Sequence, residues 1–266
     1  MIQAIYSSLS GMLNHRMRMD TISNNISNSN TTGFKTSIAT FQDALYQTMR
    51  AGTAQNNPLQ IGAGVTLASV ITNFAQGPLQ ATGRPLDLAI NGNGFFGLKR
   101  EGDDTIYYTR EGTFYLDKDG YLVNPNGLRL VQEDEKEIKI DTSKLIDSIR
   151  ITNDGEINVK YGDGSEGDKP VIGLFSFVNP NGLTKIGGNL YVYGEDTQDN
   201  PAGQRTQGRP GKDGFGTIES GSLEMANIDM AYELVNLIMT QLGYEANAKV
   251  FITSDEVLKE TIDLKR

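Results

Sequence analysis

The glycines of Gly92–Gly97 come closest to a chemical motif in this sequence. They fit the GxGxxG pattern of dinucleotide-binding proteins and follow the alternating run Leu86–Ile90. In those proteins a helix comes next, because its N-terminus holds the pyrophosphate. Here the residues that follow, 98–109, are typical of strands and turns. We therefore expect a glycine-rich turn that leads into a buried strand at Phe95 and Phe96, and no cofactor.

Motifs for metal binding and nucleophilic catalysis are no stronger. Asp117, Asp119 and Gly120 resemble part of a calcium loop, but the glycine comes early and the closing glutamate is missing. A hairpin turn is the better interpretation. With His15 as the one histidine and no cysteine, an imidazole-rich metal site and a Cys/His dyad are excluded. A hydrolase that uses only carboxylates has nothing beyond the abundance of acidic residues in its favour. We predict no catalytic, metal or cofactor site.

The charge and composition disfavour two further classes of protein. The net charge of −9 and the pI of about 4.7 argue against nucleic-acid binding, which normally requires a basic face. No run approaches the roughly 18 apolar residues of a membrane span, so no membrane insertion is expected. The first residues also lack the pattern of a secretory signal. The 266 residues suffice for one large domain or two small ones.

The elements that would position any site begin with a helix over residues 2–27. Its apolar residues recur at steps of three, four or seven, as in a helix that packs along another helix. We call them the N-terminal seam: Ile2, Ile5, Leu9, Met12, Met19, Ile22 and Ile26. The helix runs into a stretch rich in Asn, Ser and Thr, whose side chains compete for backbone hydrogen bonds. Gly33 can adopt a positive φ there and redirect the chain.

A second helix is predicted over residues 222–266, with Ser222 as its N-cap. Its apolar residues form the C-terminal seam: Met230, Leu234, Leu237, Tyr244, Ala248, Phe251, Leu258 and Ile262. Gly243 inside this helix costs about 1 kcal/mol relative to alanine, which a close approach of another helix would explain. Apolar residues at this spacing often form the core of their own subunit. Two matching terminal helices favour assembly instead, by pairing with each other or with neighbouring copies.

Between the two helices the pattern predicts a β-rich domain of short, mostly antiparallel strands separated by turns. Residues 36–50 have helical spacing but could equally be extended, and the charged segment 136–169 is expected to be the most exposed. The fold class is α+β, with the terminal helices in a coiled-coil-like layer and the β-rich domain inserted between them. The predicted divisions are 1–35 (helix and motif), 36–64 (extended segment and loop), 65–193 (β-rich domain), 194–221 (glycine-rich return loop) and 222–266 (helix).

Long motifs lie at both ends of the chain. The N-terminal motif contains Gly11, Met19, Asp20 and the motif residues Asn24, Asn25, Asn28, Gly33, Phe34 and Lys35. The C-terminal motif spans residues 231–258, and residues 86–98 and 108–114 form further motifs in the middle. In these segments the chain resembles the axial family of bacterial flagellar rod and hook proteins, with the weakest match at about 133–215. Two long motifs at opposite ends of a chain are a specific signal.

The sequence departs from the family pattern at two places. Leu242 stands where the family usually has an arginine, and His15 and Arg16 stand where it usually has glutamines. Both lie on the predicted helices, so they would change lateral contacts without changing the assignment.

The resemblance implies a structural, self-assembling protein and not an enzyme. Copies would form a hollow helical polymer that transmits torque to the hook and passes exported subunits. The implied partners are neighbouring rod and hook proteins, the flagellar export apparatus and the bushing of P and L rings. The implied location is the basal body in the cell envelope, reached by export without a cleaved signal. The run Leu59–Gly62 favours the distal rod over the proximal rod or the hook. A secreted β-rich adhesin is the competing class, and polymerisation of the purified protein would separate the two.

Overall fold

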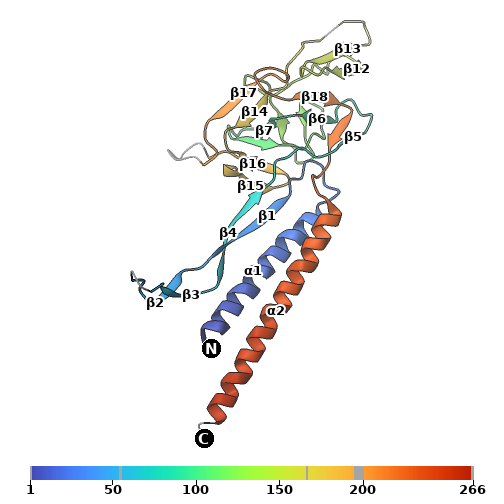
Figure 1. Cartoon of the computed structure of the whole chain (residues 1–266). Coiled ribbons are helices and arrows are strands. Elements are labelled where there is room, and N and C mark those ends of the chain that lie inside the picture. Colours follow the sequence, from blue (N-terminus) through green and yellow to red (C-terminus); the bar gives the residue numbers. More distant parts are fainter. Residues whose placement is uncertain (1, 54–55, 166, 195–200, 265–266) are drawn as a thin grey trace. The chain divides into compact units, whose positions relative to one another are not determined.

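The computed structural model describes residues 2–53, 56–165, 167–194 and 201–264. It confirms the α+β prediction, with a long helix near each end of the chain and antiparallel strands between them (Figure 1). The chain forms two compact units. The first unit contains Met1–Asn28, Thr36–Asn73 and Ile228–Arg266, and the second contains Ser29–Lys35 and Phe74–Asn227. No described helix has the length and apolar character required to cross a membrane.

The helices α1 (Ile2–Ser27) and α2 (Met230–Asp263) lie side by side in the first unit and run in opposite directions (Figure 1). The bounds of α1 confirm the prediction. The predicted start of α2 at Ser222 is wrong, because that residue begins strand β19 (Ser222–Glu224), which pairs with β5 (Leu79–Ala81). The N-cap is Asp229, whose carboxylate accepts hydrogen bonds from the amides of Ala231 and Tyr232 at 3.0 and 3.2 Å.

The first unit also contains an extended arm of four strands. Strand β1 (Ser37–Asp43) pairs antiparallel with β4 (Val65–Thr72), and β2 (Tyr46–Arg50) pairs with β3 (Leu59–Gly62). The extended alternative for residues 36–50 is therefore the correct one. Since β4 pairs with β1, it belongs to the first unit, although the sequence placed it at the start of the β-rich domain. Every residue of β2 and β3 is exposed.

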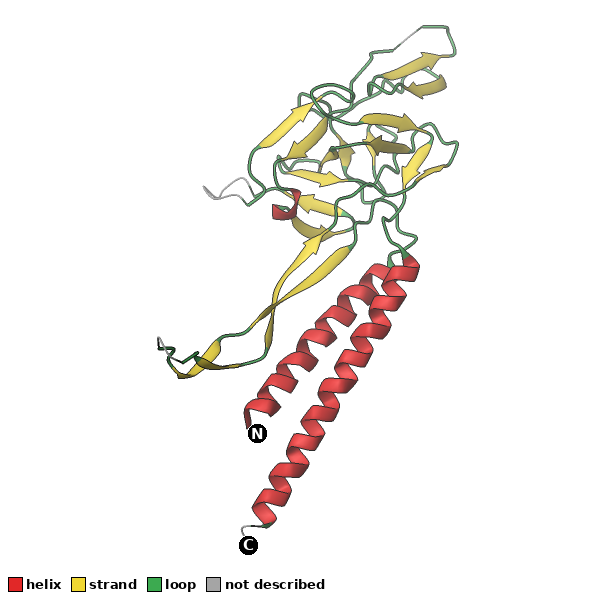
Figure 2. Ribbon diagram, in the orientation of Figure 1, coloured by secondary structure: helices red, strands yellow, loops and turns green. Residues whose placement is uncertain are grey.

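The second unit is built from short antiparallel strands (Figure 2). Its largest sheet has the order β15-β16-β8-β7-β11-β10-β9, and β14 joins it by pairing with both β7 and β17. Besides β5 and β19, its elements are β6 (Leu88–Asn91), β7 (Phe95–Lys99), β8 (Ile106–Thr109), β9 (Tyr115–Leu116), β10 (Leu122–Val123), β11 (Arg129–Leu130), β12 (Ile146–Ile151), β13 (Ile157–Tyr161), β14 (Leu174–Phe177), a 3-10 turn (Pro180–Gly182), β15 (Thr184–Gly187), β16 (Leu190–Val192), β17 (Arg205–Gly208) and β18 (Thr217–Ser220).

Part of the predicted return loop 194–221 is strand. Strand β17 pairs with β14, and β18 pairs with β6, so these backbone groups are satisfied inside sheets. Residues 195–200 of that predicted loop lie outside the described part of the chain. Glycine and proline content indicated turns here but did not reveal the short strands between them.

The glycine-rich run has the structure that its context predicts. Gly92 and Gly94 have φ angles of 113° and 136°, a region that favours glycine, and they connect β6 to β7. A strand follows them rather than a helix, so no helix N-terminus is available there for a pyrophosphate. Phe95 and Phe96 are both buried and enter two different apolar clusters, as alternation along a strand requires.

The second predicted turn is also present. Asp117–Gly120 connects β9 to β10, and the Gly120 amide donates to the Asp117 carbonyl at 3.0 Å. Within the described residues, no group of three or more His, Asp or Glu side chains is arranged to hold a metal ion.

Candidate assembly site

Two glycines and their polar partners take part in the contact between α1 and α2. A Cβ atom on Gly11 would lie 2.7 Å from Oδ1 of Asn247, and one on Gly243 would lie 2.6 Å from Cε1 of His15. The close helix approach predicted at Gly243 is therefore present, and His15 is its partner. Burial, followed by the positive charge of Arg18, lowers the pKa of His15. Glycines at these positions allow two helices to approach without large apolar side chains between them.

Asn25 joins three elements of the first unit. Its carboxamide donates to the Ser37 carbonyl at 2.9 Å and accepts from the Ser37 amide at 3.0 Å, so it pairs with the first residue of β1 as a neighbouring strand would. The same Nδ2 donates to Oε1 of Glu233 on α2 at 3.1 Å. Burial raises the pKa of Glu233, and the hydrogen bond from Asn25 opposes that rise. Asn25 of the family motif is thus a buried residue that connects α1, β1 and α2 by hydrogen bonds.

Asn24 and Asn28 of the same motif close the C-terminal end of α1. The Asn28 amide donates to the Asn24 carbonyl at 3.2 Å, and the Asn28 side chain donates to the same carbonyl at 2.8 Å. The last carbonyls of a helix have no partner within it, so a side chain that reaches back satisfies one of them.

The predicted seams are only partly covered by their own chain. In the N-terminal seam Ile22 is buried and Leu9 is exposed, and the side chain of Ile2 lies outside the described part of the structure; half-buried are Ile5, Met12, Met19 and Ile26. In the C-terminal seam the half-buried residues are Leu237, Ala248, Phe251 and Leu258, and the exposed ones are Met230, Leu234, Tyr244 and Ile262. Both seams therefore retain exposed apolar surface.

A more exposed apolar surface on α2 was not identified from the sequence. Residues at steps of three, four and seven place Val235, Ile238, Met239 and Leu242 on one face. We call this face the outer stripe, because its side chains are 55–64% exposed. From the 3.6-residue period, it lies on the opposite side of α2 from the buried residues Glu233 and Thr240, of which Glu233 contacts Asn25 on α1. The apolar spacing along residues 230–263 could have identified this face, but the sequence analysis considered only the C-terminal seam.

The second unit contains a buried ionic cluster of Lys35, Arg110 and Glu224, here the Glu224 cluster. Lys35 Nζ lies 2.6 Å from Oε1 of Glu224, and Arg110 Nη1 lies 3.2 Å from Oε2. The Gly77 amide also donates to Oε1 at 2.8 Å. Both carboxylate oxygens are thus paired, and the Glu224 side chain is fully buried.

The two cations of the cluster have further partners. Lys35 Nζ donates to the Ala75 carbonyl at 2.8 Å, and Arg110 Nη2 donates to the Gly92 carbonyl at 2.9 Å. Burial lowers the pKa of both cationic groups, and Glu224 opposes that effect. Glu224 was missed because residue 224 was predicted to lie in a helix.

Gly33 and Phe34 of the family motif also belong to the second unit. Gly33 has φ 69°, and its amide donates to the Glu224 carbonyl at 2.7 Å. A Cβ atom at Gly33 would lie 2.6 Å from the Glu111 amide nitrogen, so both the backbone conformation and the space require glycine. Phe34 is buried. Gly33 is thus hydrogen-bonded to the backbone of β19, and Lys35, two residues later, lies against the Glu224 carboxylate.

Comparison with known proteins agrees with this arrangement of motifs. Residues 5–35 match the family described as Flagella basal body rod protein. Residues 89–159 match the Flagellar hook protein FlgE/F/G D1 domain, and residues 219–264 match the Flagellar basal body rod FlgEFG protein C-terminal region. The three matches cover α1 with its motif, part of the second unit, and α2.

Whole-chain relatives decide the family. The chain is 40% identical to the flagellar basal-body rod protein FlgG of Bacillus subtilis and 38% identical to that of Borreliella burgdorferi, with 100% of each chain covered. The chain belongs to the FlgG family of flagellar basal-body rod proteins. The flagellar hook protein FlgE of Borreliella burgdorferi is more distant, at 26% identity over an alignment of 451 residues. As a FlgG-family member, the chain is a structural protein of the flagellar basal body that assembles with neighbouring rod and hook proteins.

The α1–α2 contact predicts a cross-link within one FlgG-family chain. In the double variant Gly11→Cys/Asn247→Cys, the two side chains fall within the short range that a disulfide requires, because Asn247 Cγ would lie 2.9 Å from a Cβ at position 11. The native sequence has no cysteine, so no other disulfide competes. Mild oxidation should give a monomer that migrates faster on a non-reducing gel.

The matched control is Gly11→Cys/Ala246→Cys, because Ala246 is the exposed neighbour of Asn247. This control should stay uncross-linked within the monomer. Equal cross-linking of both pairs, or cross-linked dimers without cross-linked monomer, would contradict the antiparallel helix pair.

Proposed function

We propose that the chain is the structural subunit of the distal rod, and that its copies assemble helically into a hollow drive shaft. The observation that carries this proposal is the full-length similarity to FlgG rod proteins. Repeated contacts that do not close into a ring generate an open helical polymer. Such a shaft transmits torque to the hook and passes exported subunits through its lumen.

Two apolar surfaces are the proposed contacts between copies: the half-covered seams and the outer stripe. A free subunit would expose both, and clustered apolar residues on a helix face normally pack against a partner. The helices of neighbouring copies would then form a coiled-coil-like layer. We propose that the subunit is not an enzyme and that it reaches the periplasmic part of the cell envelope through the flagellar export apparatus. The P- and L-ring bushing is a further proposed neighbour.

The test is electron microscopy of basal bodies purified from cells that lack this protein. The expected result is a rod that stops short and carries no hook, restored by expression of the wild-type chain. A rod missing from its base would favour the proximal rod. A complete rod without a hook would assign the chain to the hook, and intact flagella would contradict any axial role. Family membership favours these axial roles over a secreted adhesin.

A further inference from the structure

The β12–β13 hairpin of the second unit has one apolar face and one basic face. The pairing places Ser148 opposite Lys160 and Arg150 opposite Asn158. Because side chains alternate along a strand, these four residues share one face. The residues between them point to the other face and belong to the apolar core or pack against it: Ile149, Ile151, Ile157 and Val159.

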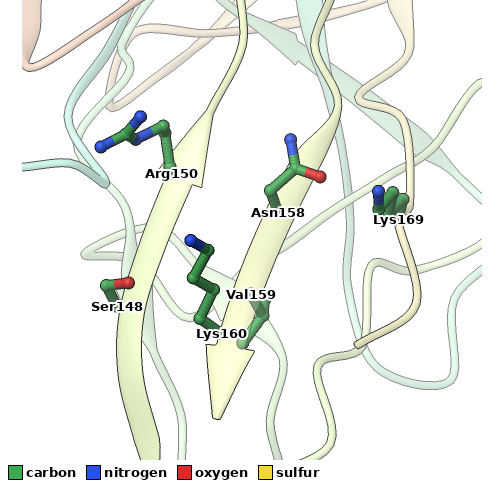
Figure 3. A pocket seen from close by; sticks show the side chains of 6 residues that line it. All are labelled: Ser148, Arg150, Asn158, Val159, Lys160 and Lys169. Atoms are coloured by element: carbon green, nitrogen blue, oxygen red, sulfur yellow. The ribbon is translucent and has the colours of Figure 1, made fainter. Parts of the chain in front are cut away.

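The basic face lines a cavity of about 230 Å³. Besides the four residues of the face, its lining includes Val159 and Lys169. Lys169 comes from a segment that runs along β13, where the Ile157 amide donates to the Pro170 carbonyl at 3.0 Å. Figure 3 shows side chains from the two strands and from this third segment around one space. Three cationic side chains, a hydroxyl group and a carboxamide therefore surround a single cavity.

Two cations of this face differ from several arginines of the second unit in having no ion pair within the described part of the chain. Three of those arginines pair with acids: Arg129 with Glu101 and Glu137, Arg205 with Glu135, and Arg209 with Glu133. Arg150 and Lys160 take part in none of the ion pairs found among the described residues. In a protein of net charge −9, these two exposed cations share one face of a single hairpin.

The geometry points to a binding site for an oxyanion, a carboxylate or phosphate group, on the basic face of β12–β13. A guanidinium group binds such oxygens in a bidentate manner, and lysine ammonium groups add point charges. The Ser148 hydroxyl and the Asn158 amide supply neutral donors. The cavity is smaller than a typical pocket for a drug-sized ligand, so it fits one anionic group rather than a large molecule. This site is independent of the proposed assembly function, because it uses none of the seam or stripe residues.

The test is calorimetric titration of the full chain with inorganic phosphate, with sodium chloride holding the ionic strength constant. Wild-type protein should bind in a saturable manner, and Arg150→Gln/Lys160→Gln should lose affinity by about tenfold or more. The control is Lys118→Gln/Lys212→Gln, which removes two exposed lysines outside the cavity lining. It should change affinity by less than about twofold. The four substituted residues, Arg150, Lys160, Lys118 and Lys212, are all exposed. Circular dichroism should therefore show that both double variants fold.

A second titration uses galacturonate, a small molecule with one carboxylate, in place of phosphate. Tighter binding of galacturonate would identify carboxylates as the natural group, and tighter binding of phosphate would identify a phosphate ligand. Absence of saturable binding in both titrations would overturn the site. So would equal losses in the two double variants, because the effect would then be general charge screening.

Discussion

Replacing Glu224 by alanine should lower the free energy of unfolding of the second unit by about 3–5 kcal/mol. The reason is the cluster that this carboxylate completes. Without it, Lys35 and Arg110 would remain as two neighbouring positive charges in a buried environment. The Gly77 amide would also lose its acceptor. Removing one partner from a buried ionic group is costly because the desolvation of the remaining charges is no longer offset.

The measurement is urea unfolding followed by near-ultraviolet circular dichroism. Its main signal should come from tyrosines buried in the second unit, such as Tyr108 and Tyr191. The control Glu219→Gln changes a less buried carboxylate on β18 that accepts from Asn91, and it should cost less than about 1 kcal/mol. A loss of similar size in the two variants would refute the special role of Glu224.

A triple variant separates the charge effect from simple loss of packing. Lys35→Met/Arg110→Met/Glu224→Leu replaces the whole cluster with apolar side chains, and such replacements are often close to neutral in stability. It should recover most of the stability lost in Glu224→Ala. A triple variant less stable than Glu224→Ala would mean that hydrogen bonds to backbone carbonyls, such as that from Lys35 to Ala75, dominate instead.

The second large effect is expected in assembly. Ile238→Asp should abolish polymerisation of the purified protein while leaving the second unit folded. Ile238 lies in the outer stripe between Val235 and Leu242, and it makes the stripe continuous. If the stripe is buried against another copy, an aspartate there must either lose its hydration or open the contact, and each option costs several kcal/mol. Sedimentation and electron microscopy would measure the polymer.

The matched control for that variant is Thr253→Asp. It adds the same single negative charge to an exposed position of α2 that belongs to neither the stripe nor the C-terminal seam. The control should polymerise as the wild type does. If both variants polymerised normally, the outer stripe would not be an assembly contact. If neither did, added negative charge on α2 would explain the loss without any role for the stripe.

Local patterns predicted the parts of this fold that depend on neighbouring residues. The apolar spacing located α1, and the missing helix after Gly94 distinguished a turn from a dinucleotide site. The pairing of β1 with β4 was not predictable in this way, because it joins segments separated by the β2–β3 hairpin. Periodicity also identifies apolar faces, whereas the close approaches of α1 and α2 at Gly11 and Gly243 are to the polar side chains of Asn247 and His15.

The same limit of local patterns explains why the Glu224 cluster was not predicted from the sequence. A lone glutamate in a polar-looking segment carries no signal of its own, and residue 224 was placed in a helix. Its partner Lys35 was identified only through the family motif, and Arg110 only as part of a second resemblance. Their meeting depends on β19 pairing with β5, which brings residues distant in the sequence to one point. Such contacts follow from topology rather than from local spacing.

The exposure of β2 and β3 on both faces has a thermodynamic consequence. Fixing each residue of this hairpin costs about 1–2 kcal/mol of conformational entropy, and an isolated two-stranded hairpin is marginally stable at best in water. Without a buried face the hairpin gains little from the hydrophobic effect to offset that cost. Its amide hydrogens should therefore exchange with solvent much faster than those of the central strands β7 and β14. The hairpin can accordingly change in length or sequence with little effect on the stability of either apolar core of the second unit.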